Sequence, residues 1–281
     1  MDEVDKTIVM TLFKDGRISK RKIAEEVGMT GTALYYRFDK LLERKIIKSF
    51  SLYVSPNFYN KYLGVAVFMS EKDIDADFIN IKVKCLNEAK FYELEGFSVE
   101  DLKDKISYMS KILGKPKIAF IPSQNPQKPS GIDIEIVKQL IKNPVIRIGE
   151  ISKAVGISVK SVKHRMNALT NKNYIKLIPV VELDKANIAV FVVYSQIISE
   201  LEFLKTCEFL RFTDYNRGVG FCVTSDLKEV EGYMKEIKRL DPSSQIMIIT
   251  DYEIMNKNAE RELEKIEHDA IKRVKFDDEN Y

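Results

Sequence analysis

The sequence is poor in the residues from which most metal centres and active sites are built. Its 281 residues include no tryptophan, two histidines and three cysteines. The cysteines, Cys85, Cys207 and Cys222, have no CxxC spacing, which indicates buried thiols rather than zinc ligands or disulfides. His164 and His268 stand apart from any triad-like arrangement, and there is no HExxH sequence or phosphate-binding loop. We therefore predict no metal, no cofactor and no enzymatic activity.

Long hydrophobic runs and a large net charge are also missing. No apolar stretch approaches 18 residues and no signal peptide is recognisable, which predicts a soluble cytoplasmic protein without a membrane partner. The net charge of +3 is too small to indicate nucleic-acid binding by itself. A chain of this length suits two to four small domains rather than one core.

The most informative feature that the sequence does have is an internal repeat. Residues 23–48, IAEEVGMTGTALYYRFDKLLERKIIK, return 128 positions later as residues 151–176, ISKAVGISVKSVKHRMNALTNKNYIK, with no gap. The match extends upstream, where Asp5 and Leu12 recur as Asp133 and Leu140. A repeat of this length indicates two copies of one module.

Each copy has the pattern of a helix-turn-helix. In the first copy Ile23, Ala24 and Val27 share one face of a short helix, which Gly28 ends because glycine takes a left-handed conformation at little cost. Thr30 can cap the second helix through its hydroxyl oxygen. That helix buries Leu34, Phe38, Leu41 and Leu42. In the second copy the corresponding cap is Ser158, and the packing residues are Val162, Met166 and Leu169.

The outward face of each second helix carries side chains that suit DNA recognition. Arginine and lysine reach phosphates or guanine edges, and hydroxyl groups bond phosphates or bases. No acid occurs from Ser158 to Lys176, whereas an ordinary solvated helix face, the alternative interpretation, usually mixes charges. The candidate DNA-binding residues are Thr30, Thr32, Tyr35, Tyr36, Arg37 and Lys40 in the first copy, and Ser158, Lys160, Ser161, Lys163, His164 and Arg165 in the second.

The first fifty residues resemble a known family. The DGRIS turn, the IAEEVGM segment, Arg37 and the KIIKSF exit look like the N-terminal winged helix-turn-helix of the Lrp/AsnC (leucine-responsive, feast/famine) transcription regulators. The resemblance implies that a ferredoxin-like βαββαβ domain follows, which in the family dimerises and often binds amino acids. We therefore expect an α+β protein, a tandem-duplicated form of the family, with two winged helix-turn-helix domains, each followed by a ferredoxin-like domain.

The expected domain boundaries follow from the composition and the repeat. They are a winged helix-turn-helix at 1–55, a truncated ferredoxin-like domain at 56–122, a linker at 123–131, a second winged helix-turn-helix at 132–180, a complete ferredoxin-like domain at 181–255 and a charged C-terminal helix or tail at 256–281. The linker, SQNPQKPSG, combines prolines with polar residues and a glycine.

The first ferredoxin-like region fits its expected fold imperfectly. We predict helices at 76–86 and 102–113 and strands at 63–69, 90–94 and 117–121, with the third strand missing or stunted. In the complete copy we predict strands at 188–197, 209–215, 219–224 and 245–252 and helices at 200–207 and 227–240. There DYNRGVG replaces the acidic GDYD-like segment that the family often has, which argues against a family-type amino-acid effector in the second half. In the first half the missing strand argues against it, because by resemblance the family's pocket lies near that hairpin.

The C-terminal segment is predicted to form a charged helix over 256–276. Its apolar stripe, Ala259, Leu263, Ile266, Ala270 and Val274, fits either a helix docked on the protein or a partner, or a solvated tail.

Our functional hypothesis is a transcription regulator that binds double-stranded DNA with two recognition helices in major grooves. The two halves would pack as a pseudo-dimer within one chain, which could itself form a homodimer and associate with the nucleoid. The alternatives are a protein-interaction scaffold of the transcription machinery and an effector-free architectural DNA binder. A more distant one is an enzyme like the sirohaem decarboxylases, which also resemble the family. Their catalysis depends on histidine and arginine in the ferredoxin-like part, where this chain has no histidine.

Overall fold

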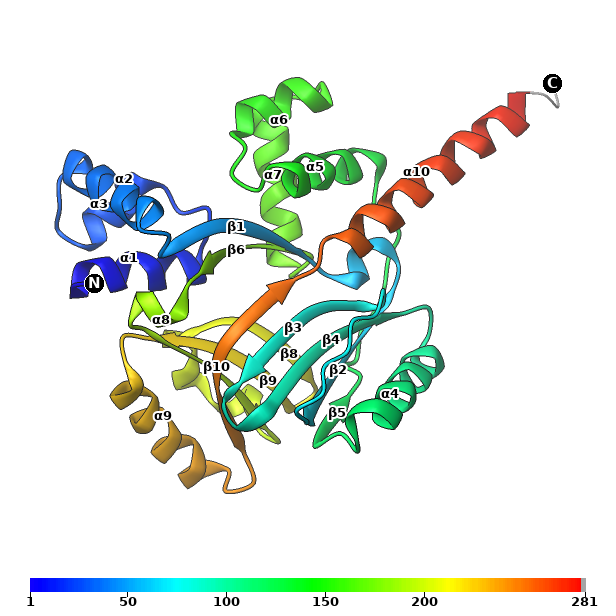
Figure 1. The fold of residues 1–281 in the computed structure, drawn as a ribbon. Helices are drawn as coiled ribbons and strands as arrows, with labels where there is room; N and C mark the ends of the chain where they lie inside the picture. The colour runs from blue at the N-terminus through cyan, green and yellow to red at the C-terminus, as the bar shows by residue number, and fades with distance from the viewer. Residues whose placement is uncertain (279–281) are drawn as a thin grey trace.

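The computed structural model describes the backbone of residues 1–278 and the side chains of residues 1–267. Two helix-turn-helix units lie at one end of the molecule and a curved sheet lies at the other, with the N-terminus among the helices (Figure 1). The first unit consists of α1 (Glu3–Lys14), α2 (Lys20–Glu26), α3 (Gly31–Glu43) and β1 (Ile47–Val54). The second consists of α5 (Gly131–Lys142), α6 (Ile148–Val155), α7 (Val159–Asn171) and β6 (Ile175–Val181).

The helices of both units follow the local signals in the sequence. Each second helix begins directly after its predicted cap. Residues 121–130 carry no helix or strand. The three cysteines are free and buried, as expected.

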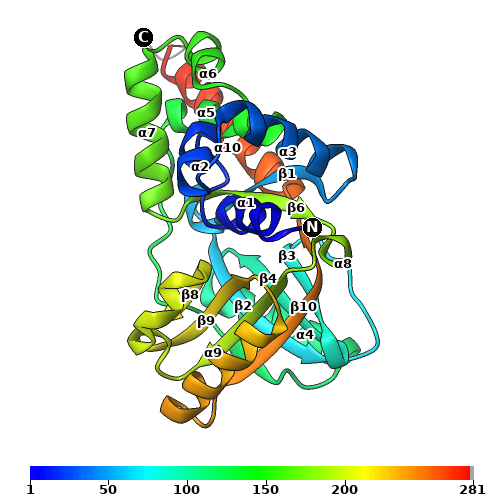
Figure 2. The same ribbon diagram turned by 90° about the vertical axis from the view of Figure 1, so that its left-hand side faces the viewer.

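The strand that follows the helices in each unit pairs with its counterpart in the other unit. Strands β1 and β6 run antiparallel as a separate two-stranded sheet, so the strand predicted at the exit of each module joins the two modules (Figure 2). Ser51 pairs with Ile178, and their counterparts 128 residues away, Pro179 and Phe50, also pair with each other. The ladder therefore lies on a pseudo-twofold axis that relates the two units.

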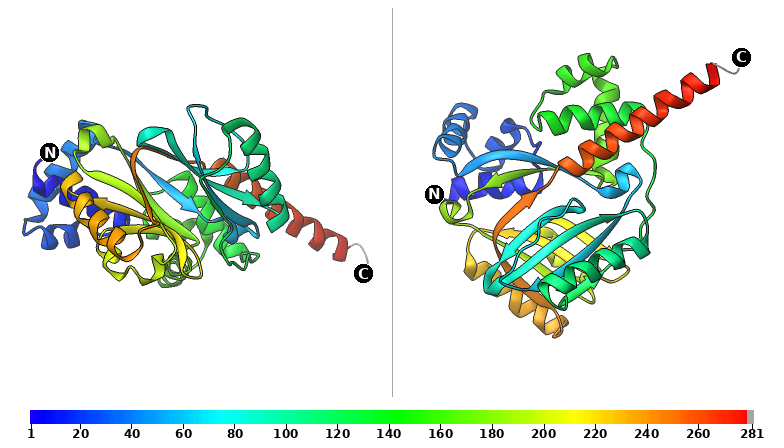
Figure 3. Two further views of the ribbon diagram at one scale, coloured as in Figure 1. Left: turned by 90° about the horizontal axis from the view of Figure 1, so that it is seen from below. Right: turned by 45° about the vertical axis from the view of Figure 1, so that its right-hand side comes forward.

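The remaining strands form one eight-stranded sheet in the order β5-β2-β4-β3-β10-β7-β9-β8. Its first half contains β2 (Tyr62–Met69), β3 (Ile79–Cys85), β4 (Ala89–Gly96) and β5 (Ile118–Phe120); its second contains β7 (Ala189–Ser195), β8 (Glu208–Asp214), β9 (Arg217–Thr224) and β10 (Gln245–Ile254). Both halves have the same strand order. The helices α4 (Val99–Leu113) and α9 (Leu227–Leu240) cover their outer faces on opposite sides (Figure 3).

The prediction for residues 76–86 is wrong. This segment is strand β3 rather than a helix, so the first half lacks the first helix of the βαββαβ pattern and keeps the hairpin. Apolar residues stand at every second position, Ile79, Ile81, Val83 and Cys85, with polar residues between them, which is the period of a strand. The predicted helix at 200–207 is also wrong as an α-helix, because two short 3-10 turns, Ile198–Glu200 and Glu202–Thr206, occupy that stretch. The third strand, predicted to be missing or stunted, is present as β4 over eight residues, so that prediction is wrong as well. The other predicted strands and helices of both halves are confirmed.

The two halves of the sheet are joined along one side only. Strand β3 pairs antiparallel with β10, whereas β5 is three residues long and does not pair with β8. The curved sheet closes on itself through side chains, since the ring of Phe91 packs against Phe221 at 5.0 Å and against Phe212 at 6.3 Å. The ferredoxin-like halves thus share one core.

The helix-turn-helix units are anchored on this body in different ways. In the first unit the ring of Phe13 packs against Phe209 at 5.0 Å, which fixes α1 on the second half of the sheet. The second unit packs against the C-terminal helix α10 (Lys257–Asp278), whose Ala259 and Leu263 are buried. In its described part α10 is therefore docked on the body of the protein. Ala270, Val274 and His268 lie outside the residues whose side chains the structure describes. No helix in the described part of the chain is long and apolar enough to span a bilayer.

Candidate nucleic-acid interface

The turns and caps that orient the two second helices are alike. Gly28 and Gly156 take left-handed conformations, with φ of +67° and +74°, after α2 and α6. The Thr30 hydroxyl accepts a hydrogen bond from the Ala33 amide at 3.3 Å, and that of Ser158 accepts one from the Ser161 amide at 3.1 Å. These contacts satisfy one of the free amides at each helix start. Both α3 and α7 are thus held as recognition helices of a helix-turn-helix would be.

The buried and exposed faces of these helices divide as the sequence predicts, except at Leu42, which is 38% exposed. Leu34, Phe38 and Leu41 anchor α3, and Val162, Met166 and Leu169 anchor α7. Of the candidate DNA-binding residues, Thr30, Thr32, Tyr35, Tyr36, Ser158, Lys160, Ser161, Lys163 and His164 are exposed, while Arg37, Lys40 and Arg165 are partly buried. Neither predicted recognition surface is covered by another part of the described chain.

The exposed face of α3 is aromatic. Tyr35 and Tyr36 are 53% and 61% exposed. The Lys20 amine lies 4.4 Å from the centre of the Tyr35 ring, and the Lys40 amine lies 4.2 Å from that of Tyr36. These cation–π contacts hold both rings at the surface, where they can stack or donate hydrogen bonds from their hydroxyl groups.

The exposed face of α7 is basic. Among the described residues, Lys160 and Lys163 make no ion pair with a carboxylate, so their charges are available to an external anion. The hydroxyl groups of Ser158 and Ser161 lie 2.9 Å apart at the helix N-terminus, where the helix dipole favours negative charge.

The two repeat-matched arginines have partners within the protein. We predict phosphate or base contacts for Arg37 and Arg165, but each guanidinium reaches back to the start of its unit's first helix. Arg37 donates to Asp2 at 2.7 Å and to Asp5 at 2.8 Å. Arg165 donates to Asp133 at 3.0 Å. Because Asp133 is the repeat counterpart of Asp5, the same clamp occurs in both units.

The clamp changes the acid–base properties of its members. Hydrogen bonds from the Asp5 amide and the Arg37 guanidinium lower the pKa of the Asp2 carboxyl. Hydrogen bonds to the Asp5 and Asp2 carboxylates raise the pKa of Arg37. The arginine therefore positions the recognition helix in each unit, and the DNA contact predicted for it stays a prediction.

The Asp5–Arg37 clamp predicts a modest loss of stability when it is broken. We expect Arg37→Gln to lower the free energy of unfolding by about 1 kcal/mol, because this ion pair is partly screened by solvent. Urea titrations would measure it. Asp5→Asn breaks the same pair but keeps the arginine's charge. If Arg37 also contacts DNA, Arg37→Gln should weaken binding in DNA titrations more than Asp5→Asn; equal losses would mean that it acts only as a clamp.

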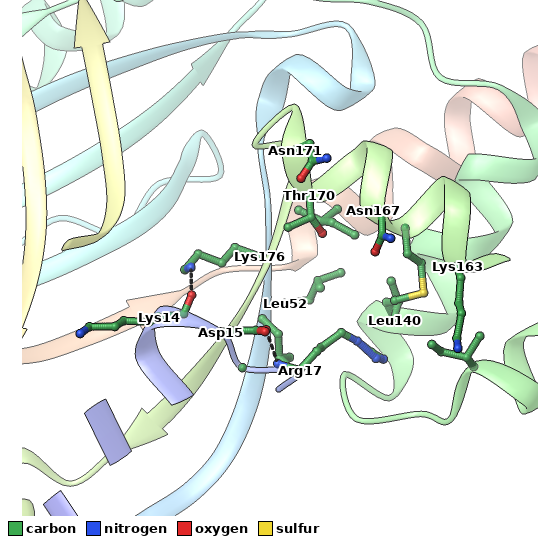
Figure 4. Close-up of a pocket in the computed structure, with 15 residues that line it drawn as sticks. Lys14, Asp15, Arg17, Leu52, Leu140, Lys163, Asn167, Thr170, Asn171 and Lys176 are labelled. Atoms are coloured by element: carbon green, nitrogen blue, oxygen red, sulfur yellow. Dashed lines mark hydrogen bonds between the residues drawn. The ribbon is translucent and has the colours of Figure 1, made fainter. Parts of the chain in front are cut away.

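A cleft of about 470 Å³ separates the two units and is called here the inter-unit cleft. The first unit lines it with the turn between α1 and α2, including Lys14, Asp15 and Arg17 (Figure 4). The second unit lines it with α7 and the start of β6, including Lys163 and Lys176. Lys14 and Arg17 were not among the residues predicted from the sequence, because only the tertiary structure brings them beside α7. The absence of acidic residues between Ser158 and Lys176 indicated only that the α7 side of the cleft is basic.

Within residues 1–267 no group of three or more histidine, cysteine or acidic side chains is arranged to hold a metal ion.

Comparison with known proteins agrees with this geometry. A model of the AsnC-type helix-turn-helix domain matches residues 1–42, and a model of winged helix-turn-helix DNA-binding domains matches residues 130–176. The chain carries two helix-turn-helix regions, the first of the AsnC type. The predicted resemblance to the Lrp/AsnC regulators and the duplicated α+β architecture are thereby confirmed.

Several HTH-type transcriptional regulators are similar to parts of this chain. One from Pyrococcus horikoshii is 33% identical over 76 residues, which are 27% of this chain and 49% of the relative. Another, from Pyrococcus furiosus, is 21% identical over 186 residues, which are 66% of this chain and 90% of the relative. The chain spans about half the length of the first curated relatives that it matches.

Solved structures of similar fold include the siroheme decarboxylase NirDL and LrpC of B. subtilis. NirDL is 14% identical, with a TM-score of 0.43, covering 96% of this chain and 99% of its own. LrpC is 17% identical, with a TM-score of 0.32, covering 45% of this chain and 97% of its own.

Proposed function

We propose that this protein is a transcription regulator that binds double-stranded DNA at two places through α3 and α7. The observation that carries the proposal is the exposure of both second helices, each capped and turned as in a helix-turn-helix, with phosphate- and base-binding side chains outward. Burial of these surfaces would have excluded it. The β1–β6 ladder supports simultaneous contact, because it fastens the two units in one pseudo-symmetric frame.

The two helices would recognise different sequences. Tyr35 and Lys163 occupy the same repeat position, and so do Tyr36 and His164. One chain should therefore prefer a site with two unlike halves, separated by about 34 Å or a multiple of it when both helices enter the major groove. A strict palindrome as the preferred site of a single chain would contradict this expectation.

Lys160→Ala provides the direct test on α7. If Lys160 reads a base, we expect a loss of about 1–3 kcal/mol in DNA-binding free energy. If it binds a phosphate, the loss should be smaller and similar on all duplexes, and the salt dependence should become shallower by about one counterion. Fluorescence anisotropy titrations on a selected and a random duplex, at several salt concentrations, would separate these results.

The control for this test is Lys228→Ala. Lys228 is an exposed lysine on α9, outside both helix-turn-helix units. The substitution Lys228→Ala removes one positive charge, as Lys160→Ala does, and should leave DNA affinity unchanged. Absence of salt-sensitive DNA binding by the wild-type protein, or equal effects of the two substitutions, would refute the proposal.

One observation favours a second candidate, a protein-interaction role for the first unit. The exposed rings of Tyr35 and Tyr36 are accompanied on α3 by Asp39 and Glu43, which are also exposed and would repel phosphates. DNA binding that is lost with Lys160→Ala and is insensitive to Tyr36→Ala would assign DNA to α7 alone and leave α3 for a protein partner.

A further inference from the structure

The inter-unit cleft concentrates positive charge without neutralising it. Four cationic residues line it, Lys14, Arg17, Lys163 and Lys176, against the single carboxylate of Asp15, and the Lys14 amine points away from the other three (Figure 4). In the described part of the chain none of these four side chains lies within ion-pair distance of a carboxylate. Like charges in one cleft repel each other, so they favour a ligand of opposite charge.

Two of these cations are also partly buried. The Lys176 amine donates a hydrogen bond of 2.9 Å to the backbone oxygen of Lys14, and burial lowers its pKa. The Arg17 guanidinium donates to the backbone oxygen of Ile146 at 3.0 and 3.4 Å, while its Nε is buried without a hydrogen-bond partner. Burial lowers the pKa of Arg17 as well. A bound anion would supply the negative charge that backbone carbonyls do not.

Neutral polar groups complete the lining. Asn167, Thr170 and Asn171 of α7 face the cleft beside the cations and can donate hydrogen bonds to oxygen atoms (Figure 4). In the first unit the corresponding positions hold Asp39, Leu42 and Glu43. Repetition of the fold therefore does not account for this lining.

The pseudo-symmetric cleft, between α3 and the turn of the second unit, is different. It is lined mainly by apolar side chains, including Phe38, Leu42, Phe50 and Val145. The pseudo-twofold axis thus relates one polar, basic cleft to one apolar cleft.

We propose that the inter-unit cleft is a binding site for a phosphate group. Phosphate matches cationic and amide donors, and the cleft volume is in the range of small-ligand sites. The phosphate can belong to a free small molecule, whose binding would act on α7 directly, or to the backbone of bound DNA. The second source rests on the proposed function; the first does not.

Lys176→Met tests the proposal, because methionine keeps much of the side-chain stem and removes the charge. With inorganic pyrophosphate as the probe, calorimetric titration of the full chain should show binding that Lys176→Met weakens about tenfold, as expected when a charge-assisted hydrogen bond is lost. The matched control is Lys48→Met at the repeat counterpart. Lys48 is exposed and already pairs with Glu182 at 2.5 Å, so its replacement should leave pyrophosphate affinity unchanged.

DNA titrations distinguish the two sources. A free phosphate ligand is supported when pyrophosphate binds without DNA and Lys176→Met weakens it. The DNA backbone is supported when pyrophosphate does not bind alone, but Lys176→Met weakens binding to every duplex and lowers the salt slope by about one. Arg17→Met serves as a second variant if Lys176→Met does not fold, because Arg17 also lines the cleft.

The proposal is overturned if pyrophosphate does not bind and neither cleft variant changes DNA affinity, or if Lys48→Met has the same effect as Lys176→Met. Failure of the proposed function has a separate signature, because the wild-type protein and Lys160→Ala would then show no specific DNA binding. In that case pyrophosphate titrations would still show whether the inter-unit cleft binds a phosphate group.

Discussion

Replacing Glu93 with glutamine is expected to stabilise the protein by about 4–5 kcal/mol above pH 8 and to have little effect below pH 4. Glu93 lies on the inner face of β4 and is fully buried, and neither carboxylate oxygen has a hydrogen-bond partner. Tyr53 and Asn80 are its polar neighbours. Burial is the main cause that raises the pKa of this carboxyl from 4.5 to about 8, because an unpaired charge is poorly solvated there.

The sign of the pH dependence follows from proton binding. Between pH 4.5 and about 8 the folded protein retains a proton on Glu93 that the unfolded chain has released. The contribution of Glu93 to stability therefore falls as pH rises through this window and is constant above it. The glutamine variant has no such proton, so its advantage over the wild type should grow over the same range.

Urea unfolding of both proteins at pH 5, 7 and 9 would measure this effect. The control is Glu100→Gln, an exposed glutamate at the start of α4, for which we expect a small difference that does not grow with pH. A Glu93→Gln variant whose advantage over the wild type is the same at all three pH values would show that Glu93 is not protonated in the folded state.

Phe13→Ala is expected to be the most disruptive of the helix-turn-helix substitutions, with a loss of about 3–5 kcal/mol in unfolding free energy. Phe13 is 1% exposed, and its ring packs against Phe209 at 5.0 Å and Tyr252 at 6.1 Å. These contacts hold the first unit on the sheet of the other half. Truncation leaves a cavity at this junction, so α1 should lose its fixed position relative to β8 and β10.

We expect Phe13→Ala to reduce DNA affinity by more than the loss of a single protein–DNA contact would. Two recognition helices on one rigid frame gain affinity because the second contact is intramolecular, and a loosened first unit forfeits that gain. We expect Phe13→Ala to bind a two-half site little better than a single half, as measured by DNA titration. Phe13→Leu keeps most of the volume and should retain the preference. An unchanged preference in Phe13→Ala would mean that β1 and β6 alone fix the two units.

Prediction from the sequence succeeded where a feature is set by residues that are close together in the chain. Thr30 and Ser158 as caps, and Gly28 as the residue that ends the first helix of the turn, were predicted because each acts within a few residues of itself. The helix predicted at 76–86 is wrong although Ile79, Ile81 and Val83 alternate with polar residues as in a strand, and pairing with β4 and β10 fixes the strand conformation. The pairing of β1 with β6 could not be predicted either, since the partner of β1 lies more than 120 residues away.

The candidate site likewise combines residues that the sequence predicts with contacts that only the tertiary structure shows. The outward residues of α3 and α7 follow from helical periodicity, so the amino-acid sequence determined which side chains each recognition helix exposes. The arginine clamps needed Asp2, Asp5 and Asp133 to be placed beside those helices, which is a contact between helices and not within one.

By itself the sequence determined that this protein has two helix-turn-helix units, because capping, glycine turns and apolar periodicity are properties of neighbouring residues. Only the tertiary structure decided that the units are fastened by a shared strand ladder and that Lys14, Arg17, Lys163 and Lys176 meet in one cleft. Such contacts join residues far apart in the chain. Their energies depend on burial and pairing, which a local sequence pattern does not predict.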